Sequence, residues 1–98
     1  MNRSDIITVL RAHEAALKAR GVAHAALFGS IGRNEQRLDS DIDIMIELDP
    51  DSRVTVFDYV DIKEYIAGLF QEPVDVVNRD GLKPSVRPRA AADAIYAF

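Results

Sequence analysis

The sequence contains no cysteine among its 98 residues. Disulfide bonds and metal sites built from thiolates are therefore excluded. No apolar run approaches the roughly 18–20 residues that a membrane-spanning helix needs. The first residues lead into an amphipathic pattern rather than a signal peptide, so we expect a cytoplasmic protein that has no membrane partner.

The chain also lacks an excess of basic residues. Its formal net charge is −4, which argues against direct nucleic-acid binding. A chain of 98 residues, 48% of them hydrophobic, can build the core of one domain, which we expect to span residues 1–98. This length leaves no room for a separate substrate domain, so a large substrate would be brought by a partner.

The acidic residues are concentrated in one segment, because residues 35–51 hold seven acids and one base. A solvated surface explains Asp49 and Asp51 but fits poorly for Asp41 and Asp43, which lie inside an apolar run. The basic residues gather instead near the end of the chain. They form either a solvated face or a group that holds a triphosphate or an acidic partner: Arg79, Lys83, Arg87 and Arg89.

Apolar spacing predicts helices in the first and the middle parts of the chain. The first helix is expected to begin at a Ser4 cap and to end at Gly21, with its apolar stripe at Ile6, Leu10 and Leu17. A second helix should begin at a capping box of Thr55 and Asp58 and run to about residue 70.

Short apolar runs predict strands at residues 22–28, 41–48 and 74–77, and residues 31–36 fit a short helix. Two prolines open an expected last helix, packed by Ala91, Ala94, Ile95 and Phe98. The order is α-β-(α)-β-α-β-α, which predicts the α+β class with a small mixed sheet covered by helices.

The strand at residues 41–48 carries paired carboxylates. Asp41 and Asp43 are two residues apart, so their side chains share one face of the strand with Met45 and Glu47. The opposite face can be buried, and it carries Ile42, Ile44, Ile46 and Leu48. Two carboxylates that close repel each other unless a cation lies between them. The strand therefore predicts a metal site.

The segment before this strand fits phosphate. Gly29 and Ser30 end the preceding apolar run, where backbone N–H groups and a hydroxyl can contact phosphate oxygens, and Arg33 could reach a polyphosphate. Acids for a metal beside a turn for phosphate indicate metal-assisted phosphoryl or nucleotidyl transfer. If Ser30 and Asp41 touch one ligand, their two strands should be antiparallel neighbours, with the acids on the more open face of the sheet.

A third acid, Asp75, lies in the short apolar strand at residues 74–77. Burying a lone carboxylate there would be costly. If Asp75 meets Asp41 and Asp43 around a cation, that cost is explained.

These motifs resemble a known family. The pattern of Gly29-Ser30, ten residues, then Asp41-Ile42-Asp43 is similar to the signature of the DNA polymerase β-like nucleotidyltransferase superfamily. The fuller run, with Arg33 and Ser40 added, resembles its minimal nucleotidyltransferase branch. Residues 73–77 match the strand of the third carboxylate, and residues 87–98 look like the usual ending of that branch. Many relatives carry glycine at the position of Asn34, so this chain departs from the pattern there.

The resemblance implies a palm-like fold and a transferase that releases pyrophosphate from ATP. It implies that Asp41, Asp43 and Asp75 are catalytic and hold Mg²⁺, as two ions, and that the nucleotide is bound by Gly29, Ser30, Arg33 and Ser40. Many minimal members are antitoxins encoded beside a HEPN-domain ribonuclease toxin, and some add AMP to a tyrosine of that toxin.

Two alternatives stay open. In the first, the protein neutralises its partner by contact alone and the acids are vestigial. In the second, a small molecule accepts the nucleotidyl group, although relatives of that kind usually carry an extra helical domain. Tyr59, Tyr65 and Tyr96 are further conceivable acceptors, but packing in the core or at its rim explains them more simply.

Overall fold

The computed structural model describes residues 2–28, 42–81 and 94–98. In this part of the chain the elements follow the order α1 (Arg3–Ala12), α2 (Glu14–Ala19), β1 (Val22–Phe28), β2 (Ile42–Leu48), α4 (Val56–Ala67), β3 (Val74–Asn78), the 3₁₀ turn η1 (Arg79–Gly81) and β4 (Ile95–Tyr96). The expected short helix at residues 31–36 lies outside the described residues.

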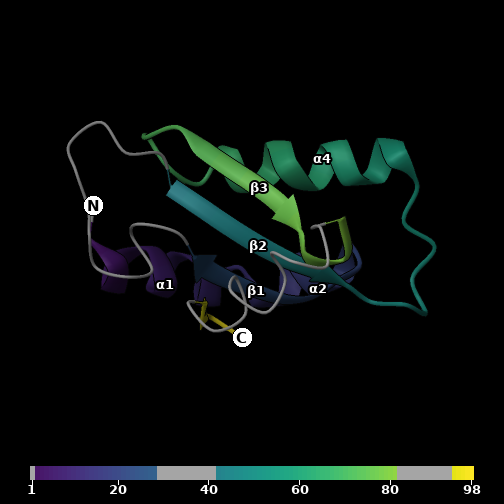
Figure 1. The fold of residues 1–98 in the computed structure, drawn as a ribbon, viewed down its shortest axis with the longest axis horizontal. Helices are drawn as coiled ribbons and strands as arrows, with labels where there is room; N and C mark the ends of the chain where they lie inside the picture. Colours follow the sequence, from purple (N-terminus) through teal and green to yellow (C-terminus); the bar gives the residue numbers. More distant parts are fainter. Residues whose placement is uncertain (1, 29–41, 82–93) are drawn as a thin grey trace.

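The described strands form one mixed sheet in the order β3-β2-β1-β4. Strand β1 pairs antiparallel with β2 and with β4, while β2 and β3 run parallel. The predicted antiparallel neighbours β1 and β2 are therefore confirmed, as is the α+β class with a mixed sheet. Figure 1 shows β3 at the edge of the sheet next to α4, with α1 and β1 together on the opposite side of β2.

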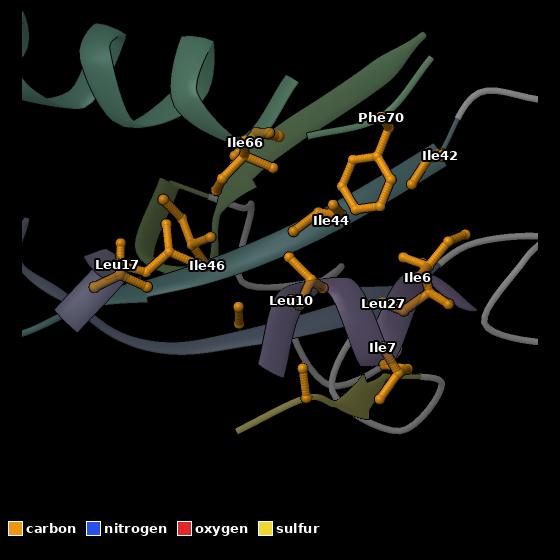
Figure 2. Close-up of a cluster of buried hydrophobic side chains, with 14 of the residues drawn as sticks. Ile6, Ile7, Leu10, Leu17, Leu27, Ile42, Ile44, Ile46, Ile66 and Phe70 are labelled. Atoms are coloured by element: carbon orange, nitrogen blue, oxygen red, sulfur yellow. The ribbon is translucent and has the colours of Figure 1, made fainter. Parts of the chain in front are cut away.

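The main core lies between the helices and one face of this sheet. Ile42, Ile44 and Ile46 of β2 are buried there together with Leu10 of α1 and Ile66 of α4. Figure 2 shows these side chains converging between the two helices and the strand. The alternation predicted for β2 is thus confirmed, and the helices leave the opposite face of the sheet uncovered.

The first helical region differs from the prediction at its start and in its middle. Asn2, not Ser4, is the N-cap, because the carboxylate of Asp5 three residues later completes a capping box with Asn2, whereas Ser4 has Ile7 at that position. The helix also breaks at His13, whose ring Nδ1 lies 2.8 Å from the hydroxyl oxygen of Tyr65.

The predicted stop at Gly21 is confirmed. Its φ of 103° is left-handed, a conformation that glycine adopts without the steric cost of a Cβ atom. Its carbonyl oxygen accepts a hydrogen bond from the backbone N–H of Asp49 at 2.8 Å. Gly21 therefore ends the helical region and also fixes the start of β1 against the end of β2.

Helix α4 begins as predicted and ends earlier. The Thr55 hydroxyl accepts from the backbone N–H of Asp58, and the Asp58 carboxylate accepts from the backbone N–H of Thr55. The helix ends at Ala67 rather than near residue 70, with Gly68 at its C-cap. Phe70 is nevertheless buried in the core from the segment that follows the helix.

The prediction of a last helix is wrong at the end of the chain. Ile95 and Tyr96 form strand β4, which pairs with Leu27 and Ala26 of β1. The spacing of Ala94, Ile95 and Phe98 fits a helix, but over so short a run a strand fits equally well, and pairing with an open sheet edge decides the outcome. Residues 84–93 lie outside the described part.

No helix in the described ranges is long and apolar enough to cross a membrane.

Candidate functional site

The face of the sheet opposite the helices carries the candidate site. Its side chains come from all the described strands, because alternate residues of a strand point to the same side. They are His24, Ala26 and Phe28 of β1, Asp43, Met45 and Glu47 of β2, Asp75 and Val77 of β3, and Tyr96 of β4. This surface, which we call the strand face, has an acidic end, an apolar middle and a polar far end.

Asp43 and Asp75 form the acidic end. They are direct partners in the register of the parallel strands β2 and β3. Neighbouring strands lie about 4.8 Å apart, so the two carboxylates leave the sheet side by side. Phe28, the last residue of β1, is the partner of Asp43 on its other side. The three strands thus bring the end of β1 and both carboxylates to one place.

The remaining predicted site residues lie outside the described part of the chain. These are Gly29, Ser30, Arg33, Ser40 and Asp41. Gly29 directly follows Phe28 in the sequence, and Asp41 directly precedes Ile42, whose partner in β3 is Val74. The described ends of β1 and β2 therefore adjoin this segment at the acidic end of the strand face.

The sequence argument about the burial of Asp75 is wrong. Asp75 is exposed rather than buried, because β3 is an edge strand and its side chain leaves the face that the helices do not cover. No desolvation cost therefore calls for a cation. The case for a cation depends instead on the side-by-side placement of Asp43 and Asp75, which brings two negative charges together.

The acidic end fits Mg²⁺ in the chemistry of its donors. Mg²⁺ is commonly held by one or two carboxylates together with phosphate oxygens and water. Asp43 and Asp75 supply two carboxylates on rigid strands. Within residues 2–28, 42–81 and 94–98 there is no group of three metal-ligating side chains, so a third protein ligand would have to come from outside these ranges.

The middle of the strand face is apolar and partly closed. Ala26 and Met45 are buried, and Phe28, Val77 and Ala94 pack against them. The strand face is therefore less open than the sequence predicted. Ala94, which directly precedes β4, is part of this packing, whereas the sequence predicted it to lie in a terminal helix.

The far end of the strand face holds a polar network that sequence reasoning missed. Glu47 accepts hydrogen bonds from an Arg79 guanidinium N–H at 3.0 Å and from the Tyr96 hydroxyl at 2.8 Å. Partial burial raises the pKa of Tyr96, and the hydrogen bond and negative charge of Glu47 raise it further, while Arg79 opposes them.

This network gives Arg79 a structural partner. The sequence grouped Arg79 with a basic segment near the end of the chain, whose other members, Lys83, Arg87 and Arg89, lie outside the described residues. The one feature of the sequence that could have indicated this pairing is the negative charge of Glu47, opposite to that of Arg79. Its pairing with Arg79 depends on η1 following β3 directly.

A hollow of about 600 Å³ lies on the other side of Asp75, between β3 and helix α4. Its lining residues come from both elements and from the loops beside them: Leu48, Val54, Thr55, Val56, Tyr59, Lys63, Asp75, Val76, Val77, Asn78 and Gly81. Partial burial raises the pKa of Tyr59, and the nearby Asp75 carboxylate adds to this, while a hydrogen bond with the backbone of Asn78 opposes it. Asp75 is therefore reachable from the hollow as well as from the strand face.

Comparison with known proteins identifies the family. The family described as nucleotidyltransferase domain matches residues 10–97. A relative from Methanocaldococcus jannaschii, named "putative protein adenylyltransferase", is 36% identical over 95 residues, which cover 95% of both chains. A solved structure called a "putative minimal nucleotidyltransferase" is 30% identical, with a TM-score of 0.71, and the match covers 97% of this chain and 95% of that one.

More distant structures share the fold. A toxin-antitoxin complex with AMP-PNP is 19% identical at a TM-score of 0.68, covering all of this chain and 73% of that one. A Shewanella oneidensis complex of a "tri-AMPylated" HEPN toxin with an MNT antitoxin is 14% identical at a TM-score of 0.63, covering 94% of this chain and 71% of that one.

The two carboxylates at the acidic end, the mixed sheet and the match over residues 10–97 agree with one another. The chain belongs to the nucleotidyltransferase domain family and, within it, to the minimal nucleotidyltransferases.

Proposed function

We propose that this protein is a Mg²⁺-dependent protein adenylyltransferase that transfers AMP from ATP to a tyrosine of a HEPN-domain toxin and so acts as its antitoxin. The observation that carries the proposal is the pairing of Asp43 with Asp75 beside the end of β1. Relatives named protein adenylyltransferases and a related complex with an AMPylated HEPN toxin support the identity of the donor and of the acceptor.

In this proposal Asp41, Asp43 and Asp75 hold Mg²⁺, with two ions at the complete site. The bound metal would lower the pKa of the attacking hydroxyl and neutralise charge on the leaving pyrophosphate. Gly29, Ser30, Arg33 and Ser40 would bind the triphosphate. The two described carboxylates differ in their exposure. Asp43 is only partly exposed, whereas Asp75 at the sheet edge is open to an incoming acceptor.

The transfer itself is a displacement at the α-phosphorus. The tyrosine oxygen forms a bond to that phosphorus, the bond from the phosphorus to the bridging oxygen of the β-phosphate breaks, and pyrophosphate leaves. Asp75 accepts the proton of the tyrosine hydroxyl. Since Asp75 lies on a strand, the backbone that carries its carboxylate is in position before the acceptor arrives.

The test is an incubation of the purified protein with α-labelled ATP, Mg²⁺ and the HEPN-domain protein encoded in the neighbouring reading frame. We expect label on the partner and a mass increase of one or more AMP groups at a tyrosine. Replacing that tyrosine by phenylalanine should remove the label. Transfer of label to a small-molecule acceptor instead would contradict the proposed substrate.

The second candidate is neutralisation by contact alone, and the apolar surface of α4 described below favours a bound protein partner. The Asp43→Asn and Asp75→Asn variants separate the two. Under the proposal they lose neutralisation of the toxin together with AMP transfer. If both variants neutralise the toxin as well as the wild type does, contact is sufficient and the transferase role is not the basis of the antitoxin effect.

A further inference from the structure

Helix α4 exposes large apolar side chains on its outer surface. Val56, Phe57 and Val60 are 76%, 81% and 45% exposed. Residues three and four apart lie next to each other on a helix, so Val60 adjoins both Val56 and Phe57 and the three form one patch. Single exposed apolar residues are ordinary, whereas a contiguous patch on a small domain marks an interaction surface. We call these three residues the α4 patch.

The α4 patch runs into the hollow that contains Asp75. Val56 belongs to both, and the hollow continues along Tyr59 and Lys63 of α4 and along β3 to Asp75. Figure 1 shows α4 beside β3 along the same edge of the sheet. A polypeptide that lies on the α4 patch is therefore led over the edge of the sheet towards a proposed catalytic carboxylate.

The charges beside the α4 patch are mainly acidic. Asp61 and Glu64 are exposed and lie four residues after Phe57 and Val60, so they adjoin the patch, and neither of them lines the hollow. Lys63 lines the hollow itself. An occupant with apolar side chains flanked by lysine or arginine complements this border.

A second copy of this chain fits the surface poorly. A twofold interface places the same patch on both subunits, so Asp61 and Glu64 of one copy would approach those of the other. The chain as a whole also carries a net charge of −4. A different protein whose basic side chains surround an apolar contact meets these acids favourably.

We infer that the α4 patch and the adjoining hollow dock the acceptor protein. Apolar side chains of the acceptor cover Val56, Phe57 and Val60, its basic side chains face Asp61 and Glu64, and its tyrosine reaches Asp75 through the hollow. This inference rests on the proposed function for the identity of the acceptor. It adds to that function the surface by which the acceptor is recognised.

The test measures binding of the HEPN-domain protein from the neighbouring reading frame by titration calorimetry. We expect the double variant Phe57→Ser with Val60→Ser to bind at least tenfold more weakly than the wild type. Two matched controls should keep the wild-type affinity to within twofold: Phe57→Leu, which retains an apolar side chain, and Ala15→Ser, which changes an exposed residue of α2. Unchanged thermal melting of every variant shows that each one is folded.

Charge reversal at the border provides a second arm. Glu64→Lys should weaken binding several-fold at low salt, and the difference from the wild type should narrow at 0.5 M NaCl because salt screens exposed charges. Equal affinity of the wild type and the double serine variant would overturn the inference. So would a wild-type dimer in sedimentation that the double serine variant dissociates, since a second copy would then occupy the patch.

The Asp75→Asn variant separates this inference from the proposed function. It should bind the acceptor within about threefold of the wild type while transferring no AMP. If the wild type transfers no AMP but the double serine variant still loses binding, the docking surface stands and the transferase role fails. If the wild type transfers AMP and the double serine variant binds normally, the transferase role stands and the docking surface fails.

Discussion

Asp43 and Asp75, thirty-two residues apart in the chain, are direct partners in the register of two parallel strands. Both leave the sheet on the face that the helices do not cover, beside Phe28 at the end of β1. The register of β2 and β3 therefore places two carboxylates side by side, a donor pair of the kind that holds a divalent cation.

Removing one of these carboxylates should stop catalysis without unfolding the protein. We expect Asp43→Asn and Asp75→Asn each to lower AMP transfer at least about a hundredfold, because a metal contributes several kcal/mol to stabilisation of the transition state. Transfer is measured with α-labelled ATP, and thermal melting checks the fold. The matched control, Asp51→Asn in the loop before α4, should transfer normally.

Mg²⁺ should stabilise the wild-type protein against heat. At roughly ten times its dissociation constant the expected gain is about 1.4 kcal/mol, or about 7 °C in Tm for a domain of this size. The same addition should leave the Tm of Asp43→Asn and Asp75→Asn unchanged. If NaCl of matched ionic strength raises the Tm of the wild type equally, the effect is charge screening rather than binding of Mg²⁺ at Asp43 and Asp75.

The core beneath the acidic end should be sensitive to truncation. Ile44 is fully buried between Asp43 and Met45, on the helix side of β2, so Ile44→Ala should lower the free energy of unfolding by roughly 2–5 kcal/mol. Urea denaturation measures this difference. Val56→Ala removes a comparable side chain from an exposed position and should change the stability by less than about 0.5 kcal/mol.

Gly21 should not tolerate alanine. Its φ of 103° is left-handed, and a Cβ atom there would lie 2.6 Å from Cγ2 of Val54. The backbone conformation alone costs about 1–2 kcal/mol for a residue with a side chain, and the clash adds to this cost. Gly68→Ala is the control in the same assay, since an alanine Cβ there meets its nearest atom at 3.4 Å and φ is −71°.

The capping box of α4 should make stability depend on pH in acid. Hydrogen bonds from the backbone and the side chain of Thr55 lower the pKa of Asp58 below 3.8 in the folded protein. The folded state therefore binds the proton less tightly than the unfolded state, so this contribution is present above pH 3.8 and is lost as the pH falls below it. The gap in urea stability between the wild type and Asp58→Asn should shrink from pH 6 to pH 2.5. A gap that stays constant over this range would argue against the carboxylate as its source.

Predictions from the sequence were correct where a structural feature depends on residues that are close together in the chain. The Thr55–Asp58 capping box, the stop at Gly21 and the alternation of Ile42, Ile44 and Ile46 each depend on near neighbours, and each is confirmed. The antiparallel pairing of β1 with β2 was also predictable, because one ligand had to touch the end of one strand and the start of the next.

Predictions from the sequence were wrong or missing where the structure depends on contacts between segments that are distant in the chain. Whether Ile95 and Tyr96 form a helix or a strand depends on the open edge of β1, and Ala94 packs against the buried Ala26 and Met45 from a distant part of the chain. The pairing of Glu47 with Arg79 and Tyr96 likewise joins three separate elements. No local pattern records such contacts.

The sequence by itself determined the residue types of the site and the faces on which they lie, because a strand's alternation fixes which side chains point together. Only the tertiary structure decided that β3 runs parallel to β2 with Asp75 level with Asp43, and that Asp75 is exposed at the sheet edge rather than buried. A shift of one residue in that register would have turned Asp75 to the core, and the choice between the registers is made by the packing of Val76 beneath α4.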